Sequence, residues 1–311
     1  MNCNVQTRIG EQFLEVPFYN ASGVLCVNTN DLDKLYECNY TGAVVTKSCT
    51  LKYRSGNPEP RYWCGEYGSI NSSGLPNNGF DYYAKWMIDK NTKPVFLSTS
   101  PMNKNELNII ANKIRDLDYI KNPEFNLSCP NVINKPQIGY SFDDMKNTLQ
   151  MITEILGEKK FGVKLPPYFD PIHFDYASDI LSYYNTLSYI TCSNSIGNGL
   201  LINTETEETR IRPKNGLGGI GGKYCLPVAL SNIFQFNERL PNIDIVGCGG
   251  IYNGEDVFQH ILAGACAVQV GTCLYENGIS TFNKLYNELI ELMRKKGYKC
   301  LNEFKGKIKI I

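Results

Sequence analysis

The chain is poor in histidine, has no excess of either charge and contains no long apolar run. Only two of its 311 residues are histidine, so a metal site built from several imidazoles has little support. Lysine plus arginine and aspartate plus glutamate each number 31, and this balance lacks the basic footprint of a nucleic-acid-binding protein. No stretch approaches the roughly 18 apolar residues of a membrane span, and the N-terminus lacks a signal-peptide pattern. We therefore expect a cytoplasmic protein with no metal and with no nucleic-acid or membrane partner.

Cysteine is plentiful, but its spacing does not suit a zinc cluster or a disulfide framework. The chain has 12 cysteines, and none are arranged as CxxC. In a cytosolic protein we expect them to be free thiols, most of them buried. Cys129 differs because it lies in FNLSCPNV (125–132), where two asparagines flank it and a proline follows. This setting marks Cys129 as a candidate for chemistry.

Short β-like runs alternate with amphipathic segments along the chain. The eight runs span residues 18–23, 43–48, 94–100, 124–130, 161–167, 189–195, 243–250 and 267–273. Helical periodicity follows most of them, at 106–117, 142–156, 228–240, 255–265 and 281–296. Strands that alternate with helices pair in parallel through right-handed crossovers, so eight units predict an α/β fold, a (β/α)8 TIM barrel. We expect a single domain over residues 1–311; a doubly wound sheet is the alternative.

Polar, cationic and glycine residues end these apolar runs. In (β/α)8 barrels the functional site lies at the carboxyl ends of the strands. The accumulation of such residues there predicts a site for a large polar ligand. They are Ala21, Ser22, Gly23, Lys47, Ser48, Asn126, Cys129, Lys164, Asn194, Ser195, Gly249, Gly250, Gly271 and Thr272.

Glycines at the last two run ends predict a phosphate site. The runs end in GCGG and GTC, and each leads into a helix. Glycine lets backbone N–H groups approach a ligand, and a following helix N-terminus adds favourable charge; ordinary glycine turns are the alternative. A second glycine-rich stretch, NGLGGIGGK (215–223), contains GxGxxG. A charged segment precedes it instead of a buried strand, so we reject a dinucleotide-binding fold there and expect at most a phosphate contact.

The strand ends also offer a base, two cations and several amides. His260 falls within a predicted helix and His173 in PPYFDPIHFDY, so both are expected to be structural. Cys129 is then the candidate base or nucleophile, because a thiol can lose its proton when a cation or substrate assists. Lys47 and Lys164 end apolar runs, where a charge needs an anionic partner; one could meet a substrate carboxylate and the other a reduced cofactor. Amide edges that suit a pyrimidinedione or isoalloxazine ring are offered by Asn71, Asn126, Asn131 and Asn194.

Several of these stretches resemble one enzyme family. FNLSCPNV occurs with NASGVLC (20–26), TKS (46–48), INSSGLPNNGFDYY (70–83), FGVKLPPYFD (161–170), TCSNSIGNGL (191–200), GCGGIYNGED (247–256) and VQVGT (268–272). From about residue 14 onward, the chain resembles the soluble, fumarate-using class 1A of dihydroorotate dehydrogenases. The resemblance implies a homodimeric barrel that binds FMN and oxidises dihydroorotate to orotate in pyrimidine biosynthesis. It also implies fumarate as the electron acceptor, with succinate as the product.

The resemblance implies roles for individual residues. Cys129 would take the proton from C5 of dihydroorotate while hydride leaves C6 for flavin N5. Lys47 would meet the substrate carboxylate, and Lys164 the reduced flavin ring. The other implied substrate contacts are Asn71, Ser73, Gly74, Leu75, Asn126, Asn131, Asn194 and Ser195. The implied flavin contacts are Ala21, Ser22, Gly23, Lys47, Ser48, Asn126, Lys164, Gly222, Cys248, Gly249, Gly250, Gly271 and Thr272.

The chain departs from the family pattern at three places. Ser73 replaces a common methionine, Ser193 replaces a larger aliphatic residue, and VINKPQ (132–137) replaces a stretch that often has proline and glycine. None removes a group that the reaction needs. Three alternatives stay open: a dihydrouridine synthase acting on RNA, the NAD-linked class with its partner subunit, and a barrel kept as a binding scaffold. The zero net charge argues against the dihydrouridine synthase, and KPQ at 135–137 argues against the NAD-linked class. The intact cysteine and lysines argue against a binding scaffold.

Overall fold

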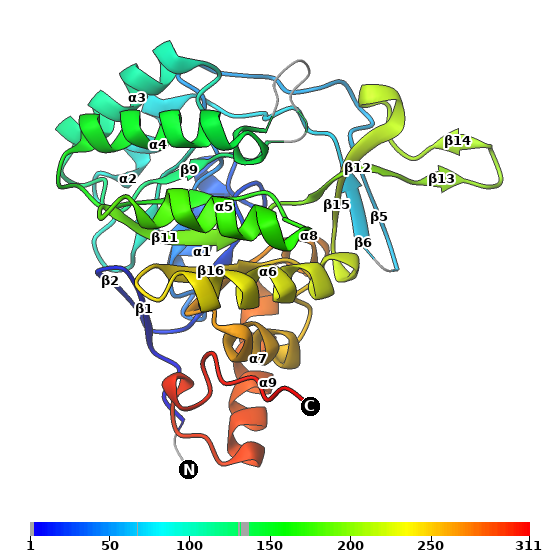
Figure 1. The fold of residues 1–311 in the computed structure, drawn as a ribbon. Coiled ribbons are helices and arrows are strands. Elements are labelled where there is room, and N and C mark those ends of the chain that lie inside the picture. The colour runs from blue at the N-terminus through cyan, green and yellow to red at the C-terminus, as the bar shows by residue number, and fades with distance from the viewer. Residues whose placement is uncertain (1–2, 67, 130, 132–136) are drawn as a thin grey trace.

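The structure is a computed structural model and describes residues 3–66, 68–129, 131 and 137–311. Its centre is a barrel of parallel strands surrounded by helices (Figure 1). A curled seven-stranded sheet runs in the order β3–β17–β16–β11–β10–β9–β8, and β4 pairs in parallel with β7. The expected (β/α)8 fold is confirmed.

The barrel strands coincide with the eight apolar runs. Each run contains or overlaps a strand, although the strands are shorter because the runs continue into the loops that follow. Leu97 separates β7 from β8, which lie in one run. The strands are β3 (Phe18–Asn20), β4 (Val44–Val45), β7 (Val95–Phe96), β8 (Ser98–Thr99), β9 (Glu124–Asn126), β10 (Phe161–Lys164), β11 (Leu187–Cys192), β16 (Asp244–Cys248) and β17 (Ala267–Val270).

The barrel closes between β3 and β4 through a side chain. The Gly42 N–H donates to the Phe18 carbonyl oxygen at 3.0 Å. One step further, Asn20 Oδ1 accepts from the Val45 N–H at 2.9 Å, and Asn20 Nδ2 donates to the Val45 oxygen at 2.8 Å. The buried amide therefore takes the place of a ladder of backbone hydrogen bonds, because it offers one donor and one acceptor.

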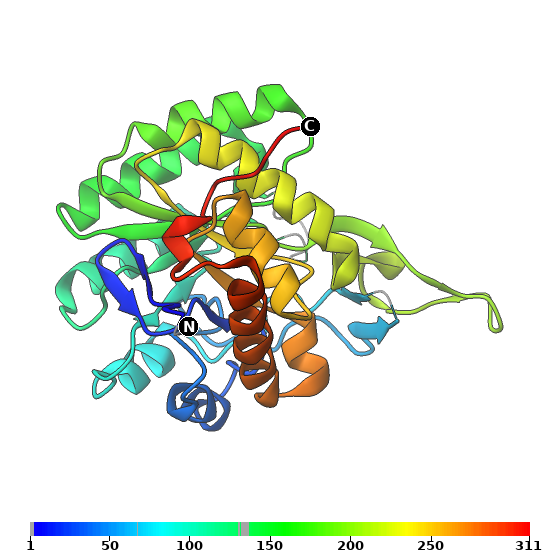
Figure 2. The same ribbon diagram turned by 90° about the horizontal axis from the view of Figure 1, so that it is seen from below.

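Helices ring the barrel, as Figure 2 shows from below. The expected helices are α3 (Lys104–Asp116), α4 (Phe142–Leu156), α6 (Leu226–Arg239), α7 (Gly254–Ala263) and α9 (Ser280–Lys296). The structure adds α1 (Thr29–Glu37), α2 (Phe80–Met87), α5 (Pro171–Ser182) and α8 (Thr272–Asn277). Short 3-10 helices are η1 (Ile138–Tyr140), η2 (Pro213–Gly216), η3 (Lys223–Cys225) and η4 (Leu301–Glu303). Within the described ranges, no helix has both the length and the hydropathy needed to cross a bilayer.

Helix α5 begins at an aspartate followed by a proline, Asp170 and Pro171. Asp170 Oδ1 accepts a hydrogen bond from the Ile172 N–H at 3.0 Å, and Pro171 occupies the first turn. Aspartate before proline is a typical helix start. His173 therefore lies in the first turn of α5, where its side chain is exposed.

An antiparallel sheet of four strands, absent from the sequence prediction, stands beside the barrel. Its order is β12–β15–β6–β5. It brings loop segments that follow two different barrel strands, β4 and β11, into one layer. A hairpin of two further strands projects away from the barrel in both views (Figures 1 and 2). The bounds are β5 (Tyr62–Gly65), β6 (Gly68–Asn71), β12 (Ile196–Leu200), β15 (Leu217–Gly221), and for the hairpin β13 (Ile202–Asn203) and β14 (Glu208–Thr209).

The amino end of the barrel is filled by apolar side chains. The hairpin of β1 (Thr7–Ile9) and β2 (Gln12–Leu14) contributes two fully buried residues. They cluster with Tyr19, Phe96 and Tyr189, whose neighbouring ring centroids are 5.6 Å and 5.5 Å apart. Such aromatic packing fills the inside of the barrel at this end.

His260 should make the folded protein less stable in acid. Its ring is completely buried in α7, with Nδ1 donating to the Asp256 carbonyl oxygen at 2.9 Å. Gly247 makes room for it, since a Cβ there would lie 2.4 Å from His260 Cδ2. Burial lowers the pKa of His260 from 6.5 to about 4. The unfolded chain therefore binds a proton that the folded chain rejects, and stability is complete above pH 6.5 and falls toward pH 4.

The measurement is urea unfolding of the wild type and His260→Met at neutral pH and at about pH 4.5. We expect the wild type to lose roughly 2–3 kcal/mol of unfolding free energy through this group, and the variant to lack that part of the loss. His173→Gln changes an exposed imidazole and should leave the pH dependence unaltered. An equally steep dependence in His260→Met would contradict the assignment.

Candidate active site

A cavity lies at the carboxyl ends of the barrel strands, between the barrel and the antiparallel sheet. Its volume is about 490 Å³, within the range of small-molecule sites. Every site residue expected from the sequence lines it. These residues are Ala21, Ser22, Gly23, Lys47, Ser48, Asn71, Ser73, Gly74, Leu75, Asn126, Cys129, Asn131, Lys164, Asn194, Ser195, Gly222, Cys248, Gly249, Gly250, Gly271 and Thr272.

Other lining residues had not been singled out as contacts. Most lie in loops, and three come from the antiparallel sheet or from α8, namely Tyr62, Ser69 and Tyr275. Ser193, noted as a departure from the family, also lies on the wall. The stretch INSSGLPN pointed toward Ser69, its neighbour, but the aromatic residues had no comparable signal. The additional residues are Val24, Val27, Glu59, Arg61, Tyr62, Ser69, Pro76, Cys225, Ile251, Tyr252 and Tyr275.

Four asparagines from separate elements form two pairs in the cavity. Asn131 Nδ2 donates to Asn71 Oδ1 at 2.9 Å. Asn194 Nδ2 lies 3.4 Å from Asn126 Oδ1 and also donates to the Ser128 carbonyl oxygen. Asn131 Oδ1 is buried and lacks a hydrogen-bond partner among the described residues. An unused acceptor in a polar cavity suits an N–H group of a ring ligand, because an unsatisfied buried oxygen is costly.

Cys129 follows β9 on a loop held at both sides. Its side chain is half-buried and faces the cavity. Before it, the Ser128 N–H donates to Asn126 Oδ1 at 3.0 Å. After it, Asn57 Nδ2 donates to the backbone carbonyl oxygen of Asn131 at 3.1 Å and to that of Ser72 at 2.8 Å. These two bonds join the loop to the segment after β6. Residues 132–136, which include most of VINKPQ and of KPQ, lie outside the described residues.

Lys47 places a cation on the cavity wall. Its Nζ would lie 3.3 Å from a Cβ added at Gly23. No carboxylate forms an ion pair with it in the part of the chain that the structure describes. Burial is the main cause that lowers the pKa of Lys47, while Cys26 and Cys129 act in the opposite direction. A carboxylate ligand would supply the missing partner.

Lys164 ends β10, and a side chain of the barrel interior, Gln269, holds its ammonium group. The side chain is buried, and Nζ donates to Gln269 Oε1 at 2.8 Å. Cys248 Sγ lies 3.6 Å from the same nitrogen. β9 and β10 pair Lys164 with Asn126, which also lines the cavity, and we call this part of the lining the cavity floor. Lys47 and Lys164 therefore line the cavity from the ends of two different strands, β4 and β10.

Glycine loops and hydroxyl groups meet at the end of the cavity near β16 and β17. Gly222, Gly249 and Gly250 have positive φ of 80°, 130° and 79°, and a Cβ at Gly250 would lie 2.4 Å from Leu226 Cβ. Tyr62 and Tyr252 line the same region, and both hydroxyl oxygens are buried without a partner among the described residues. Tight glycine loops and unused hydroxyl donors fit a phosphate group.

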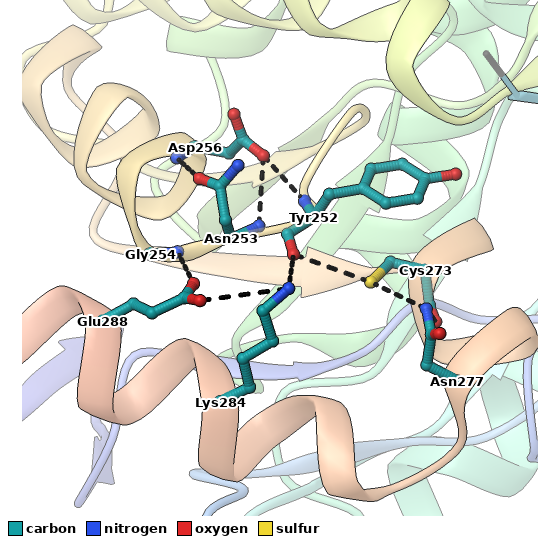
Figure 3. Close-up of polar contacts among 8 residues, drawn as sticks. All are labelled: Tyr252, Asn253, Gly254, Asp256, Cys273, Asn277, Lys284 and Glu288. Carbon is teal, nitrogen blue, oxygen red and sulfur yellow. Dashed lines mark hydrogen bonds and ion pairs between the residues drawn. The ribbon is translucent and has the colours of Figure 1, made fainter. Parts of the chain in front are cut away.

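The expected contribution of the helix N-terminus is wrong for α7, as Figure 3 shows. The Gly254 N–H already donates to Glu288 Oε2 at 2.8 Å, and the Asp256 N–H to Asn253 Oδ1 at 2.9 Å. Asp256 Oδ2 in turn accepts from the Tyr252 N–H at 2.8 Å. Two carboxylates therefore occupy this helix end, where they disfavour a further anion. The glycine loops and the two tyrosine hydroxyls remain as groups that could donate to a phosphate.

Two further expectations concern the glycine-rich stretch and metals. The GxGxxG residues Gly216–Gly221 end η2 and form β15, which pairs antiparallel with β12 and β6. A dinucleotide site needs a parallel strand that leads into a helix, so the rejection is confirmed. Among the described residues, no group of three or more His, Cys, Asp or Glu side chains could hold a metal ion.

Comparison with known proteins identifies the family. A sequence profile described as dihydroorotate dehydrogenase matches residues 4–293. The dihydroorotate dehydrogenase (fumarate) of Trypanosoma cruzi is 49% identical over 300 residues, which cover 95% of each chain. The protein of the same name from Lachancea kluyveri is 51% identical over 300 residues, 94% of this chain and 95% of that one.

A solved structure agrees with the fold. The crystal structure of DHODH in complex with ferulenol from Eimeria tenella matches with a TM-score of 0.80 and 17% identity, over 98% of this chain and 88% of that chain. At that identity the match speaks for the barrel architecture. The full-length sequence matches carry the assignment: the chain belongs to the dihydroorotate dehydrogenase family, in its class 1A, whose curated members are named for fumarate.

Proposed function

We propose that the chain acts as a single FMN-binding barrel, residues 1–311, that oxidises dihydroorotate to orotate in pyrimidine biosynthesis and passes the electrons to fumarate. The relatives' names support the reaction. The observation that carries the proposal is the convergence of one half-buried thiol, two lysines and two asparagine pairs in one cavity. Each group matches a part of the substrate or the cofactor.

The cavity fits FMN on the evidence of its own residues. Lys164 offers a fixed ammonium on the floor, and the hydroxyls of Tyr62 and Tyr252 are unused buried donors at the glycine-loop end. Gly271 leaves open space, since a Cβ there would have only Ala21 Cβ near it, at 3.7 Å. We expect the ring to lie against Lys164 and the phosphate among Gly222, Gly249, Gly250, Gly271 and Thr272. When bound, FMN supplies a hydride acceptor.

The substrate would lie between the lysine and asparagine groups. Lys47 would pair with the carboxylate, assisted by the backbone N–H groups of Gly74 and Leu75. The asparagine pairs would hold the ring amides, with Ser195 beside them. Cys129 would remove the C5 proton as hydride leaves C6. It is the candidate base because His173 is exposed on α5 and His260 is buried in α7, and neither lines the cavity.

The oxidising half-reaction would use the same cavity. Fumarate is a dicarboxylate, so one carboxylate can take the place beside Lys47 that orotate leaves. A proton from Cys129 and a hydride then complete succinate. One pocket for both halves predicts ping-pong kinetics in which orotate competes with fumarate.

Stopped-flow mixing of photoreduced holoenzyme with fumarate, without oxygen, tests this assignment. We expect the flavin absorbance to return rapidly, and orotate to slow its return. A quinone and NAD serve as comparison oxidants. Reoxidation by either of them with none by fumarate would contradict fumarate as acceptor, and reoxidation by NAD would favour the NAD-linked alternative. Bleaching of the flavin by dihydroorotate tests the first half separately and distinguishes this function from a dihydrouridine synthase or a binding scaffold.

Homodimerisation remains a prediction from the family resemblance, and a cytoplasmic location remains a prediction from the sequence pattern. Light scattering during size-exclusion chromatography would measure the first. A measured mass close to 35.0 kDa, the mass of one chain, would contradict homodimerisation.

A further inference from the structure

One carboxylate lies inside the barrel, beneath the cavity. Glu124 begins β9 and is fully buried. Its Oε2 accepts from Thr191 Oγ1 at 2.8 Å and from Gln269 Nε2 at 3.0 Å, and Ser98 Oγ lies 3.4 Å from Oε1. Within the described ranges, no lysine or arginine forms an ion pair with it. A buried carboxylate without a cation in contact is expensive, and a neutral glutamine would fill the same space.

Gln269 connects this carboxylate to Lys164. Its Oε1 accepts from Lys164 Nζ at 2.8 Å, and its Nε2 donates to Glu124. The amide oxygen therefore faces the ammonium and the amide nitrogen faces the carboxylate, the arrangement in which both charges strengthen the two hydrogen bonds. All three side chains are almost fully buried and come from three different strands. The lysine on the cavity floor thus has a counter-charge one amide away.

We propose that Glu124 is a positioning residue for Lys164 that acts through Gln269. It fixes the direction of the ammonium and offsets part of the positive charge that the cavity presents to a flavin ring. The inference rests on the proposed function, because it takes the ring to lie against Lys164. A ring that accepts hydride from dihydroorotate and returns it to fumarate needs an intermediate electron affinity. The Glu124 carboxylate lowers the electron affinity of the ring because it offsets part of the charge of Lys164.

The test compares the FMN-bound full chain with its Glu124→Gln variant, which keeps the shape of the side chain and removes its charge. Two quantities are measured: the two-electron midpoint potential and the dissociation constant for sulfite, which forms an anionic adduct with flavins. With the counter-charge gone, Lys164 should favour anionic forms of the ring more strongly. We expect the potential to become more positive and sulfite to bind at least about tenfold more tightly, the scale of one charge interaction inside a protein.

A second variant distinguishes positioning from general damage, and a third is the control. Gln269→Leu keeps both charges and removes the amide, so the ammonium can approach Glu124 directly and move away from the cavity. The expected shifts are therefore opposite: a more negative potential and weaker sulfite binding. Glu158→Gln makes the same charge change at an exposed position, where solvent screens it, and should leave both quantities unchanged.

Opposite shifts in the two variants support the inference, because a purely structural role would not reverse sign. Unchanged potential and sulfite affinity in FMN-bound Glu124→Gln would overturn it. If that variant does not fold, Gln269→Leu alone decides, and a potential equal to that of the wild type overturns the inference. Failure of the wild type to bind FMN would instead refute the proposed function. Neither measured quantity requires dihydroorotate or fumarate, so the two failures remain distinguishable.

Discussion

Replacing Cys129 with alanine should slow reduction of the bound flavin by dihydroorotate at least about 10²-fold, the usual effect of losing a general base. FMN should stay bound, because the residues expected to hold it, apart from Asn126 at the end of β9, lie on other loops and strands. Serine should be a poor substitute, since its hydroxyl is a far weaker acid than a thiol. Anaerobic stopped-flow absorbance of the flavin gives the rate directly.

The control for this experiment is Cys38→Ala. Cys38 is half-buried, as Cys129 is, but it follows α1 and does not line the cavity. Its loss should leave the rate of flavin reduction unchanged. If Cys129→Ala reduced its flavin at the wild-type rate, the base would have to be another group. The same variant should also slow reoxidation by fumarate, because the proton that completes succinate comes from the same thiol.

Lys47→Ala should weaken orotate binding by roughly 30-fold or more, the scale for removing one partner of a desolvated charge pair. The reason is that Lys47 has no carboxylate partner of its own among the described residues, so its charge is available to a ligand. Titration with orotate, followed through the flavin spectrum, measures the change. Lys164→Ala should instead lose FMN or shift its potential. Lys52→Ala, at an exposed lysine nearby in sequence, should alter neither.

Orotate binding should also depend on pH through Lys47. Burial lowers the pKa of the free lysine from its usual 10.5, and a bound carboxylate raises it again. Affinity is therefore complete below the lowered pKa and falls as pH rises through it toward 10.5. Lys47→Ala should lack this alkaline loss. The same alkaline weakening in the variant, or unchanged orotate affinity at neutral pH, would contradict the role of Lys47.

The sequence by itself determined the eight barrel runs, five of the helices and the chemical character of the strand ends. Apolar runs and helical periods are local properties, because side chains a few residues apart decide which face of an element is buried. Parallel strands then bring their carboxyl ends to one edge. For this reason the sequence predicts that Lys47, Asn126 and Cys129 share one cavity with Asn194 and Gly249, which are distant from them in the chain.

Only the tertiary structure decided which side chains meet. The pairing of Asn131 with Asn71, the closure of the barrel by Asn20 and the use of the α7 N-terminus by Glu288 all join residues distant in sequence. Glu124 begins one run and Gln269 lies within another, and nothing local shows that they share a hydrogen bond. Such contacts depend on strand register and barrel curvature, which arise from packing across the whole chain and leave no periodic signal in the sequence.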